Sequence, residues 1–454
     1  MTTPLRAMFL LSVMAMISAP AQAAPGDTTW VRTFDHDFYN WATAHEQTFT
    51  FPDSSIDWRQ ILLHYTIGCP EAPNDCDPWD RLGWVQVLKE TGDGGGGRGV
   101  EPFEIARIIT PYDITGGSRP DSCTWVLDVS DYESLLHGEV TLRSYIESWI
   151  GGNNGWLVTI DFAFIEGLAP TLLEPVRVVN LWSNYHAVYG DPGQPIDDHL
   201  QPVAVDVGPE VESAKVRVIT TGHGQGNTDN CAEFCPKEHS ILAGADAYAH
   251  TLWRSDCSQN TCSPQGGTWY LQRAGWCPGD KVDPWDIDVT ASVTPGGEAT
   301  FDYNVEDYFN FCCTCNPDCV SGVTCTDCMY NSTGHTEPHY SIQAQLILYE
   351  TSPVASAGEA ARAAAPRLFQ NSPNPFRPST WITYSIARAG EARLFIYDAA
   401  GRVIRTISRD YASAGTYRVS WDGKDARGRD VPAGVYFYGL RGAEAAPRKM
   451  ILIR

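Results

Sequence analysis

Three carboxylates stand apart from the other acidic residues of this chain because of their immediate neighbours. The first is Asp80, which lies between Trp79 and Arg81, so an indole and a guanidinium flank one carboxyl group. Such neighbours partly exclude water from an acid while keeping it ionisable, which is how proteins tune catalytic carboxylates. Taken alone, Asp80 is most simply interpreted as half of a surface ion pair, and the case for chemistry depends on the other two acids.

The second carboxylate, Glu147, lies two residues from Tyr145 and two from Trp149. If this segment is a strand, the three side chains share one face. Aromatic rings beside an acid suit a sugar, because C–H faces pack on rings while hydroxyl groups need polar partners. An exposed strand face explains the pattern equally well.

The third carboxylate, Glu233, lies between Cys231 and Cys235. A disulfide across so short a loop stabilises by only about 2 kcal/mol, so its expected use is to fix the direction of Glu233. Metal binding by these cysteines is the less favoured alternative. With Arg273 and Trp276 beside Cys277, the segments supply acids, arginines and tryptophans, as a carbohydrate site with hydrolytic potential requires.

The composition indicates a folded protein of two or three domains. The chain has 454 residues, 43% of them hydrophobic, and a formal charge of -23. That charge repels phosphate backbones and anionic lipids, which argues against nucleic acid as a partner. Residues 367–454 have the opposite sign, with 15 basic and 7 acidic residues, so a domain border is expected near residue 366.

The N-terminus is typical of a secretory signal peptide, here assigned to residues 1–23. Arg6 precedes an apolar stretch, and Ala21-Gln22-Ala23 forms a small-residue cleavage site. No later segment is apolar enough to span a bilayer, so we expect periplasmic export followed by an extracellular or cell-surface location. In such a protein 14 cysteines favour disulfides, with zinc at Cys325-x-x-Cys328 as an alternative.

Periodicity of two dominates the chain and predicts antiparallel β-sandwiches. Candidate strands are 59–67, 83–89, 140–149, 156–165, 215–220 and 339–349. The segment 351–366 is rich in Ala, Ser and Gly and is predicted to be a linker before a small sandwich. His223, in Gly222-His223-Gly224-Gln225-Gly226, is more simply interpreted as part of a flexible loop than as a site residue.

Several short segments give the chain a resemblance to the bacterial peptide-N-glycosidase F family, and they occur in the family's order. They are Phe49-Thr50-Phe51-Pro52, Cys76-Asp77-Pro78-Trp79-Asp80-Arg81, Arg107-Ile108-Ile109-Thr110-Pro111-Tyr112, Asp128-Val129-Ser130-Asp131-Tyr132, Glu147-Ser148-Trp149, Cys231-Ala232-Glu233-Phe234-Cys235 and Arg273-Ala274-Gly275-Trp276-Cys277-Pro278-Gly279. The sequence departs from the family at Phe234, where the family has tryptophan, and before Gly222-His223, where a family tryptophan is missing.

The resemblance implies an all-β fold with two eight-stranded jelly rolls side by side, residues 24–166 and 167–350, and an active site in the cleft between them. A cysteine-rich insertion, 312–328, is added to the second. By the same resemblance the catalytic residues are Asp80, Glu147 and Glu233. The implied sugar contacts are Trp79, Arg81, Trp149, Arg273 and Trp276. The implied disulfides are Cys69 with Cys76, Cys231 with Cys235, and Cys257 with Cys277, and the partners of Cys123 and Cys262 stay open.

Residues 367–454 resemble the FlgD-like immunoglobulin-type modules that serve type IX-like secretion as sorting signals. The residues that carry this resemblance are Asn371-Ser372-Pro373-Asn374-Pro375-Phe376, Tyr397-Asp398-Ala399-Ala400-Gly401-Arg402, Trp421-Asp422-Gly423 and Ala433-Gly434-Val435-Tyr436. The module carries no cluster of residues suited to catalysis.

The function expected from this resemblance is hydrolysis of the amide between the innermost N-acetylglucosamine of an N-glycan and asparagine, without metal or cofactor. The partners would be N-glycosylated peptides and glycoproteins, with secretion machinery engaging the C-terminal module, and the protein is expected to be a monomer. A non-catalytic glycan-binding protein on the same scaffold is the alternative. A copper monooxygenase needs paired histidine sets that His335 and His339 alone do not supply.

Overall fold

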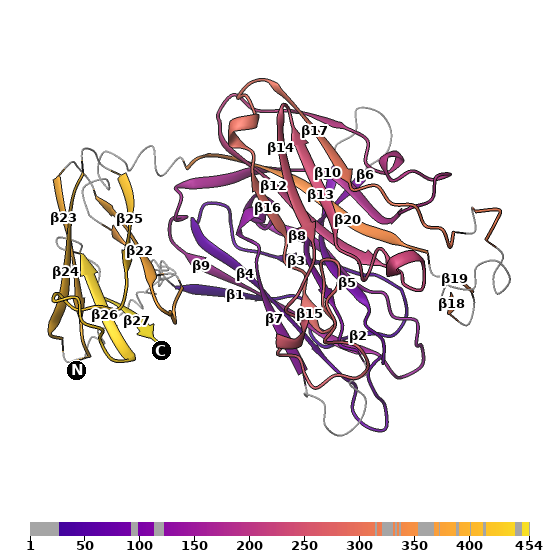
Figure 1. Ribbon diagram of the computed structural model, residues 1–454, viewed down its shortest axis with the longest axis horizontal. Helices are drawn as coiled ribbons and strands as arrows, with labels where there is room; N and C mark the ends of the chain where they lie inside the picture. The colour runs from indigo at the N-terminus through magenta and orange to yellow at the C-terminus, as the bar shows by residue number, and fades with distance from the viewer. Residues whose placement is uncertain are drawn as a thin grey trace, which may run out of the picture. The chain divides into compact units, whose positions relative to one another are not determined.

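A computed structural model describes residues 27–91, 99–112, 122–313, 316–319, 330–331, 334–335, 337–352, 367–371, 373–386, 390–399, 401–411, 415–440 and 447–453. Residue contacts divide the chain into two compact units, Met1–Thr351 and Ser352–Arg454. Strands dominate both units (Figure 1), so the all-β prediction is confirmed. The predicted signal peptide, most of the predicted linker, and Cys315, Cys325 and Cys328 lie outside the described residues.

The first jelly roll packs two antiparallel sheets face to face. One sheet has the order β1-β9-β4-β7, with β2 paired to β9, and the other has the order β15-β6-β5-β8-β3. The strands of the first sheet are β1 (Thr28–Arg32), β2 (Asp37–Tyr39), β4 (Trp58–Gly68), β7 (Ser122–Asp128) and β9 (Trp156–Glu166). Those of the second are β3 (His45–Thr50), β5 (Leu82–Thr91), β6 (Gly99–Ile109), β8 (Glu139–Ile146) and β15 (Asp280–Lys281). Alternation in β4 buries Ile61, Leu63, Tyr65 and Ile67 on one face, as predicted.

The second jelly roll has eight strands of its own in two four-stranded sheets. Their orders are β10-β20-β12-β16 and β11-β17-β13-β14. The strands are β10 (Leu173–Val188), β20 (His339–Thr351), β12 (Val211–His223), β16 (Trp285–Asp288), β11 (Val203–Asp206), β17 (Glu298–Val305), β13 (Lys237–Ala243) and β14 (Asp246–Leu252). A core that includes Val216, Ile241, Phe301 and Leu346 fills the space between these sheets.

The two jelly rolls are joined through side chains and by one disulfide. Arg107 on β6 donates hydrogen bonds to the Ser341 carbonyl on β20, at 2.7 Å, and to Thr221 Oγ1 on β12, at 3.2 Å. A disulfide connects Cys123 on β7 with Cys262, which resolves the partners that the sequence left open. Residues from the two jelly rolls are therefore held in fixed register where they meet.

The remaining cysteines that the structure describes are also bonded. Cys69 pairs with Cys76, Cys231 with Cys235, and Cys257 with Cys277, which matches the pairing that the family resemblance implied. In the predicted insertion, Cys312, Cys313 and Cys319 are disulfide-bonded. Among the described residues no helix is both long and apolar enough to cross a membrane.

The second unit is a small β-sandwich with its own core. Its sheets have the orders β21-β22-β25 and β24-β23-β26-β27. The strands are β21 (Arg367–Leu368), β22 (Thr380–Ile386), β25 (Gly415–Trp421), β24 (Val403–Tyr411), β23 (Gly390–Tyr397), β26 (Gly434–Leu440) and β27 (Arg448–Leu452). Trp421, Tyr438 and Met450 are buried at its centre. The short elements elsewhere are β18 (Tyr330–Asn331), β19 (Gly334–His335), and the 3-10 helices η1 (Ser130–Leu135), η2 (Ile196–Asp198), η3 (Thr228–Asn230), η4 (Cys257–Gln259) and η5 (Thr290–Ser292).

Candidate active site

The loop that carries Asp80 is fixed by the buried carboxylate of Asp77, directly before β5. Asp77 accepts hydrogen bonds from Arg81 Nε at 2.8 Å, from Ser148 Oγ at 2.7 Å and from the backbone N–H of Trp79 at 3.1 Å. The Arg81 ion pair is therefore formed with Asp77, and the interpretation of Asp80 as half of a surface ion pair is wrong. Arg81 is engaged by Asp77, and among the described residues no ion pair to the half-buried Asp80 carboxylate is found.

Thr110, at the end of β6, anchors the same loop from the other side. Its Oγ1 accepts a hydrogen bond from the Arg81 N–H at 2.7 Å and donates one to the Trp79 carbonyl at 2.9 Å. The backbone on both sides of Asp80 is therefore held to the second sheet of the first jelly roll. Trp79 itself projects outward, about half exposed, with its ring 5.8 Å from that of Tyr112.

Glu147 reaches the Asp80 loop, but not on the strand that the sequence predicted. Strand β8 ends at Ile146, because the Ser148 N–H turns back to the Ile146 carbonyl and its hydroxyl group points to Asp77. The Glu147 N–H donates to the Leu82 carbonyl at 2.9 Å, which places Glu147 beside the start of β5. The prediction that β8 continues to Trp149 is therefore wrong.

Trp149 forms an exposed aromatic pair with a residue that the sequence analysis missed. Its ring lies 5.7 Å from that of Trp41 in an edge-to-face arrangement, and both side chains are about half exposed. Tyr145 packs instead on Trp84, with ring centroids 4.0 Å apart. The aromatic surface beside Glu147 therefore consists of Trp41 and Trp149, and sequence offers no signal for Trp41 beyond its residue type.

Glu233 comes from the second jelly roll and is directed by the Cys231–Cys235 disulfide loop. Its backbone N–H donates to the Gly224 carbonyl at 3.3 Å, and its carbonyl accepts from the Ala274 N–H at 2.9 Å. Its side chain accepts a hydrogen bond from Arg273 Nε at 3.2 Å. The loop is thus attached to the segment that carries Arg273.

Arg273 lies between two aromatic rings and is only 3% exposed. Its guanidinium is 5.0 Å from the centre of the Phe234 ring and 4.9 Å from that of Trp276. Its Nη1 donates to the carbonyls of Thr268 and Leu271. Trp276 is also only 3% exposed, and its Nε1 donates to the Gly222 carbonyl at 2.7 Å. Phe234 and Trp276 therefore position Arg273, and neither Arg273 nor Trp276 offers much surface to a sugar.

The charges of two arginines link the three carboxylates, since Arg273 acts on Asp80 and Glu233, and Arg81 acts on Asp80 and Glu147. Burial raises the pKa of Asp80 to about 6 against the opposing charges of Arg273 and Arg81. Burial raises the pKa of Glu233 to about 7, opposed by Arg273 and reinforced by the charge of Asp80. For Glu147, partial desolvation raises the pKa, while Arg81 and His186 oppose the change. Carboxyl groups that titrate near neutral pH suit general acid and base catalysis.

The histidine-rich edge of the second jelly roll borders this site. His223 is the last residue of β12, so the prediction that it lies in a flexible loop is wrong. Its ring lies 5.4 Å from those of Trp276 and His339, and the His186 ring lies 3.9 Å from that of His339. His186 Nε2 donates a hydrogen bond to the Glu337 carboxylate at 2.9 Å. Sequence spacing gave no signal for this stack, because three different strands supply its histidines.

Among the described residues, one grouping has the spacing of metal ligands. It consists of Cys69, Asp75 and Cys76, and its two cysteines are joined in a disulfide. That grouping therefore offers no thiolate ligands.

The chain is similar to known proteins of one family. The family model described as peptide-N-glycosidase F, C terminal, matches residues 194–318. The peptide-N(4)-(N-acetyl-beta-D-glucosaminyl)asparagine amidase F of Elizabethkingia miricola is 30% identical over 299 residues, which cover 63% of this chain and 80% of that protein. The chain belongs to the peptide-N-glycosidase F family. The resemblance found in the sequence is confirmed.

Solved structures agree with this assignment. PNGase F from Flavobacterium meningosepticum, a glycosylasparaginase, superposes with a TM-score of 0.54 at 25% identity, covering 72% of this chain and 96% of that one. PNGF-II superposes with a TM-score of 0.50 at 15% identity, covering 71% of this chain and 65% of that one, which shows the shared fold alone. The double jelly roll predicted for the chain is therefore confirmed.

The C-terminal unit has its own match. The FlgD Ig-like domain model matches residues 378–443, inside the second compact unit. The predicted immunoglobulin-like sandwich is confirmed, whereas the domain boundaries given in the sequence analysis stay predictions.

Proposed function

We propose that this protein is a glycoamidase that hydrolyses the amide bond between the innermost N-acetylglucosamine of an N-glycan and asparagine. The observation that carries the proposal is that Asp80 and Glu233, from different jelly rolls, both titrate near neutrality and share the charge of Arg273. Membership of the peptide-N-glycosidase F family supports the same reaction class.

The reaction requires one bond to form and one to break. The oxygen of water bonds to the side-chain carbonyl carbon of the glycosylated asparagine, and its proton passes to a carboxylate. The C–N bond then breaks, and the nitrogen leaves with the intact glycan after accepting a proton. The products are an aspartate and a glycosylamine. Near-neutral carboxyl groups can exchange both protons at the working pH.

Each charged residue of the site has a role in this scheme. Asp80 is the central group, and Glu233 and Glu147 hold water and sugar by hydrogen bonds and tune Asp80 electrostatically. Arg81, oriented by Asp77, stabilises negative charge that develops on the carbonyl oxygen. Arg273 acts as a positioning residue for Glu233 because its own N–H groups are engaged by protein atoms.

The aromatic residues supply the sugar contacts. Trp79 and Trp149 are about half exposed, as a surface that packs on a pyranose face requires. The Trp276 ring packs against the Arg273 guanidinium. We propose that Trp276 shapes the site without direct contact to the glycan.

The wider biology of the protein belongs to the same proposal. Residues 1–23 would direct export, and the FlgD-like unit would engage secretion machinery, which gives an extracellular or cell-surface monomer. Its substrates would be N-glycosylated peptides and glycoproteins.

Incubation of the mature protein with a defined N-glycopeptide, with chelator present, tests the function. Mass spectrometry should show loss of the whole glycan and conversion of asparagine to aspartate, which would also establish metal independence. A peptide that keeps one N-acetylglucosamine would mean glycosidic cleavage and would contradict the proposal. Glycan binding without any product would favour the non-catalytic glycan-binding alternative.

A further inference from the structure

Trp41 is an exposed aromatic residue beside the candidate active site, and it has no role in the proposed reaction. It follows β2, and its side chain is 53% exposed, against 49% for Trp149. The two rings lie 5.7 Å apart with an angle of 75° between their planes. Single exposed tryptophans are common on protein surfaces, but two that meet beside the carboxylate of Glu147 form an apolar surface that a ligand can cover.

Hydrogen bonds hold Trp41 against the segment that follows Trp149. The Gly151 N–H donates to the Asn40 carbonyl at 2.8 Å, and the Asn40 side chain donates to the Gly152 carbonyl at 2.5 Å. A Cβ atom on Gly151 would lie 3.7 Å from the Trp41 ring, so the ring packs against this backbone. Trp41 is therefore attached to the chain two and three residues beyond Trp149.

The same segment, residues 147–155, is joined to the loop that carries Asp80. The Gly155 N–H donates to the Asp75 carbonyl at 3.0 Å, and the Asp75 N–H donates to the Asn154 side chain at 2.8 Å. The tryptophan pair therefore has a fixed position relative to Asp80.

The indole nitrogens of the pair differ from those of buried tryptophans in the same jelly rolls. Trp125, Trp182 and Trp276 each donate the indole N–H to a backbone carbonyl, at 3.1, 2.8 and 2.7 Å. For Trp41 and Trp149, no such bond is found to any residue that the structure describes. Each of these two side chains thus combines an exposed ring with a donor for a ligand hydroxyl group.

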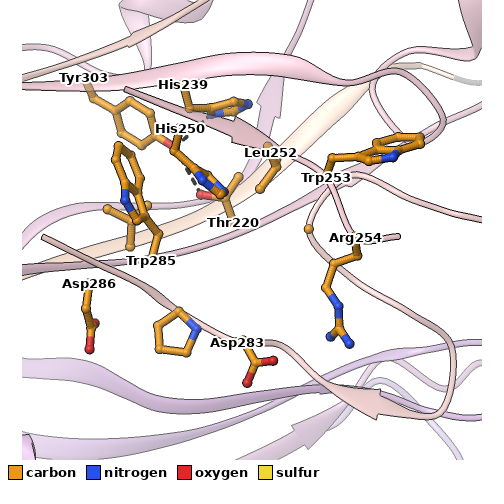
Figure 2. Close-up of a pocket in the computed structure, with 13 residues that line it drawn as sticks. Thr220, His239, His250, Leu252, Trp253, Arg254, Asp283, Trp285, Asp286 and Tyr303 are labelled. Atoms are coloured by element: carbon orange, nitrogen blue, oxygen red, sulfur yellow. Dashed lines mark hydrogen bonds between the residues drawn. The ribbon is translucent and has the colours of Figure 1, made fainter. Parts of the chain in front are cut away.

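An aromatic pocket elsewhere in the molecule lacks this combination. It has a volume of about 260 Å³ and lies in the second jelly roll (Figure 2). There Trp253 Nε1 donates to Gln272 at 2.8 Å, and the Tyr303 hydroxyl bonds to Thr220 at 3.1 Å. Polar groups of that pocket are therefore already bonded to the protein, unlike those of the tryptophan pair.

The ligand that matches the tryptophan pair is a chain of sugars. Sugar rings pack their C–H faces on aromatic rings, and their hydroxyl groups accept hydrogen bonds from indole N–H groups. Two ring planes at 75° cannot both lie flat against one pyranose face. The second ring is therefore available to a neighbouring sugar of the same glycan.

We propose that Trp41 contacts the N-glycan beyond its innermost sugar and makes the protein favour glycans longer than one sugar. This inference rests on the proposed glycoamidase function, because that function places the innermost sugar at the carboxylates. Trp149 is two residues from Glu147, whereas Trp41 is attached farther along the segment, at residues 151 and 152. Trp41 is therefore a specificity-determining residue, and Trp149 stays the contact nearer to the carboxylates.

The test is ligand-observed NMR titration of the whole protein with two probes, N-acetylglucosamine and the core pentasaccharide of N-glycans. The wild-type protein should bind the pentasaccharide more tightly. Trp41→Ala should raise the Kd for the pentasaccharide about fivefold, as the loss of one aromatic contact allows. Its Kd for N-acetylglucosamine should stay within about twofold of the wild-type value.

Two further variants separate the aromatic contact from a general effect. Trp41→Phe keeps a ring but loses the N–H, so its Kd for the pentasaccharide should lie between those of the wild-type protein and Trp41→Ala. The matched control is Trp30→Ala, since Trp30 is 58% exposed and lies on β1, in the sheet that contains neither β5 nor β8. Trp30→Ala should bind both probes as the wild-type protein does.

Three outcomes would overturn the proposal. The first is an unchanged Kd for the pentasaccharide in Trp41→Ala. The second is an equal rise for both probes, which would place Trp41 at the innermost sugar or give it a structural role. The third is no binding of the pentasaccharide by the wild-type protein at about 10 mM.

The titration uses free glycans, so it requires no bond cleavage and is independent of the reaction. If the wild-type protein releases no glycan from a glycopeptide but the titration gives the expected difference, the glycoamidase function is rejected and Trp41 remains a glycan contact. If glycan is released but Trp41→Ala binds both probes like the wild-type protein, only the role of Trp41 is rejected.

Discussion

Two arginine–carboxylate arrangements lie where the jelly rolls meet, and they differ in how fully they are paired. In the first, Glu104 and Arg107 are completely buried and joined by two hydrogen bonds of 2.7 and 2.9 Å. Glu104 also accepts from the Tyr185 hydroxyl at 2.8 Å, and the remaining Arg107 nitrogen donates to Ser341 and Thr221. Both the Glu104 carboxylate and the Arg107 guanidinium therefore have hydrogen-bond partners beyond each other.

In the second arrangement the acids, Glu233 and Asp80, have fewer hydrogen-bonding and ionic partners. Arg273 gives Glu233 a single hydrogen bond of 3.2 Å and donates elsewhere to backbone carbonyls. Asp80 feels the charges of Arg273 and Arg81, but the Arg81 ion pair goes to Asp77. Buried acids with too little compensation hold their protons to higher pH.

The difference shows how the same residue types serve structure in one place and chemistry in another. The saturated pair lies within β6 and holds Arg107 and Glu104 in place, and each of them also bonds to the second jelly roll, Arg107 to Ser341 and Thr221 and Glu104 to Tyr185. Neither charge can lose its partner without a large cost. An undersaturated pair keeps protons exchangeable near neutral pH. Four substitutions test this contrast.

Asp80→Asn should have the largest effect. Without an ionisable group at this position, we expect glycan release to fall at least about 1,000-fold. The fold should be kept, because Asn is isosteric with Asp and Asp80 forms no ion pair in the part of the chain that the structure describes. Turnover on a glycopeptide and circular dichroism measure the two properties. The matched control is Asp161→Asn, which removes a surface pair with Arg32 and should leave turnover unchanged. Substantial residual turnover in Asp80→Asn would reject Asp80 as the central residue.

Arg107→Met should act on stability. Glu104 would remain buried without its cation, so we expect the free energy of unfolding to fall by about 3–5 kcal/mol, measured by urea denaturation. The double variant Glu104→Gln with Arg107→Met should recover part of this loss, since no unpaired charge then remains. A loss below about 1 kcal/mol in Arg107→Met would show that the buried pair and the bonds of Arg107 to the second jelly roll contribute little to stability.

Glu233→Gln should flatten the pH dependence of stability. The folded-state pKa of about 7 lies above the ordinary value of 4.5, so the folded protein binds the extra proton between these values and loses stability as pH rises through them. The change in the free energy of unfolding that this proton contributes is at most about 3 kcal/mol, because the pKa rises from 4.5 to about 7. Water screens it only slightly, since the side chain is 13% exposed. Thermal denaturation at pH 5 and pH 8 should show a smaller difference for the variant. An identical difference would contradict the raised pKa.

Arg273→Gln should shift the pH profile of activity. The arginine charge favours the ionised forms of Asp80 and Glu233, so its removal raises the pKa of both. The acidic limb of the kcat/KM profile should move to higher pH by about one unit, and Arg273→Lys should move it less. If kcat/KM falls evenly at every pH with its limbs unmoved, Arg273 holds structure without tuning the acids.

Sequence patterning anticipated the strands better than it anticipated the site. Alternation located β4 because it buries one face in a sandwich core. The strands β9 and β20 were also located, although most of their residues are buried on both faces. It extended β8 too far, because the hydrogen bond from Ser148 to Asp77 that ends the strand joins distant parts of the chain. For the same reason it did not find the Cys123–Cys262 disulfide. The pairing of Arg81 with Asp77 is local, but alternation does not say which of two nearby carboxylates, Asp77 or Asp80, the arginine contacts.

The candidate catalytic residues were predicted from the sequence, but the side chains packed around them were not. Family resemblance selected Asp80, Glu147 and Glu233, and the structure brings them together around two arginines. The burial of Trp276 and Arg273 depends on the packing of the 273–276 segment on β12, which no local pattern encodes. Trp41 and His186 border the site from segments with no motif of their own.

The most direct test of the central claim is hydrolysis of an N-glycopeptide in water enriched with oxygen-18, compared between the wild-type protein and Asp80→Asn. If the carboxylates direct water to the asparagine carbonyl, the peptide product should be an aspartate that carries one oxygen-18 atom, the glycan should leave as a glycosylamine, and Asp80→Asn should give neither product. A peptide that retains unlabelled asparagine, with oxygen-18 in the released sugar, would contradict the account.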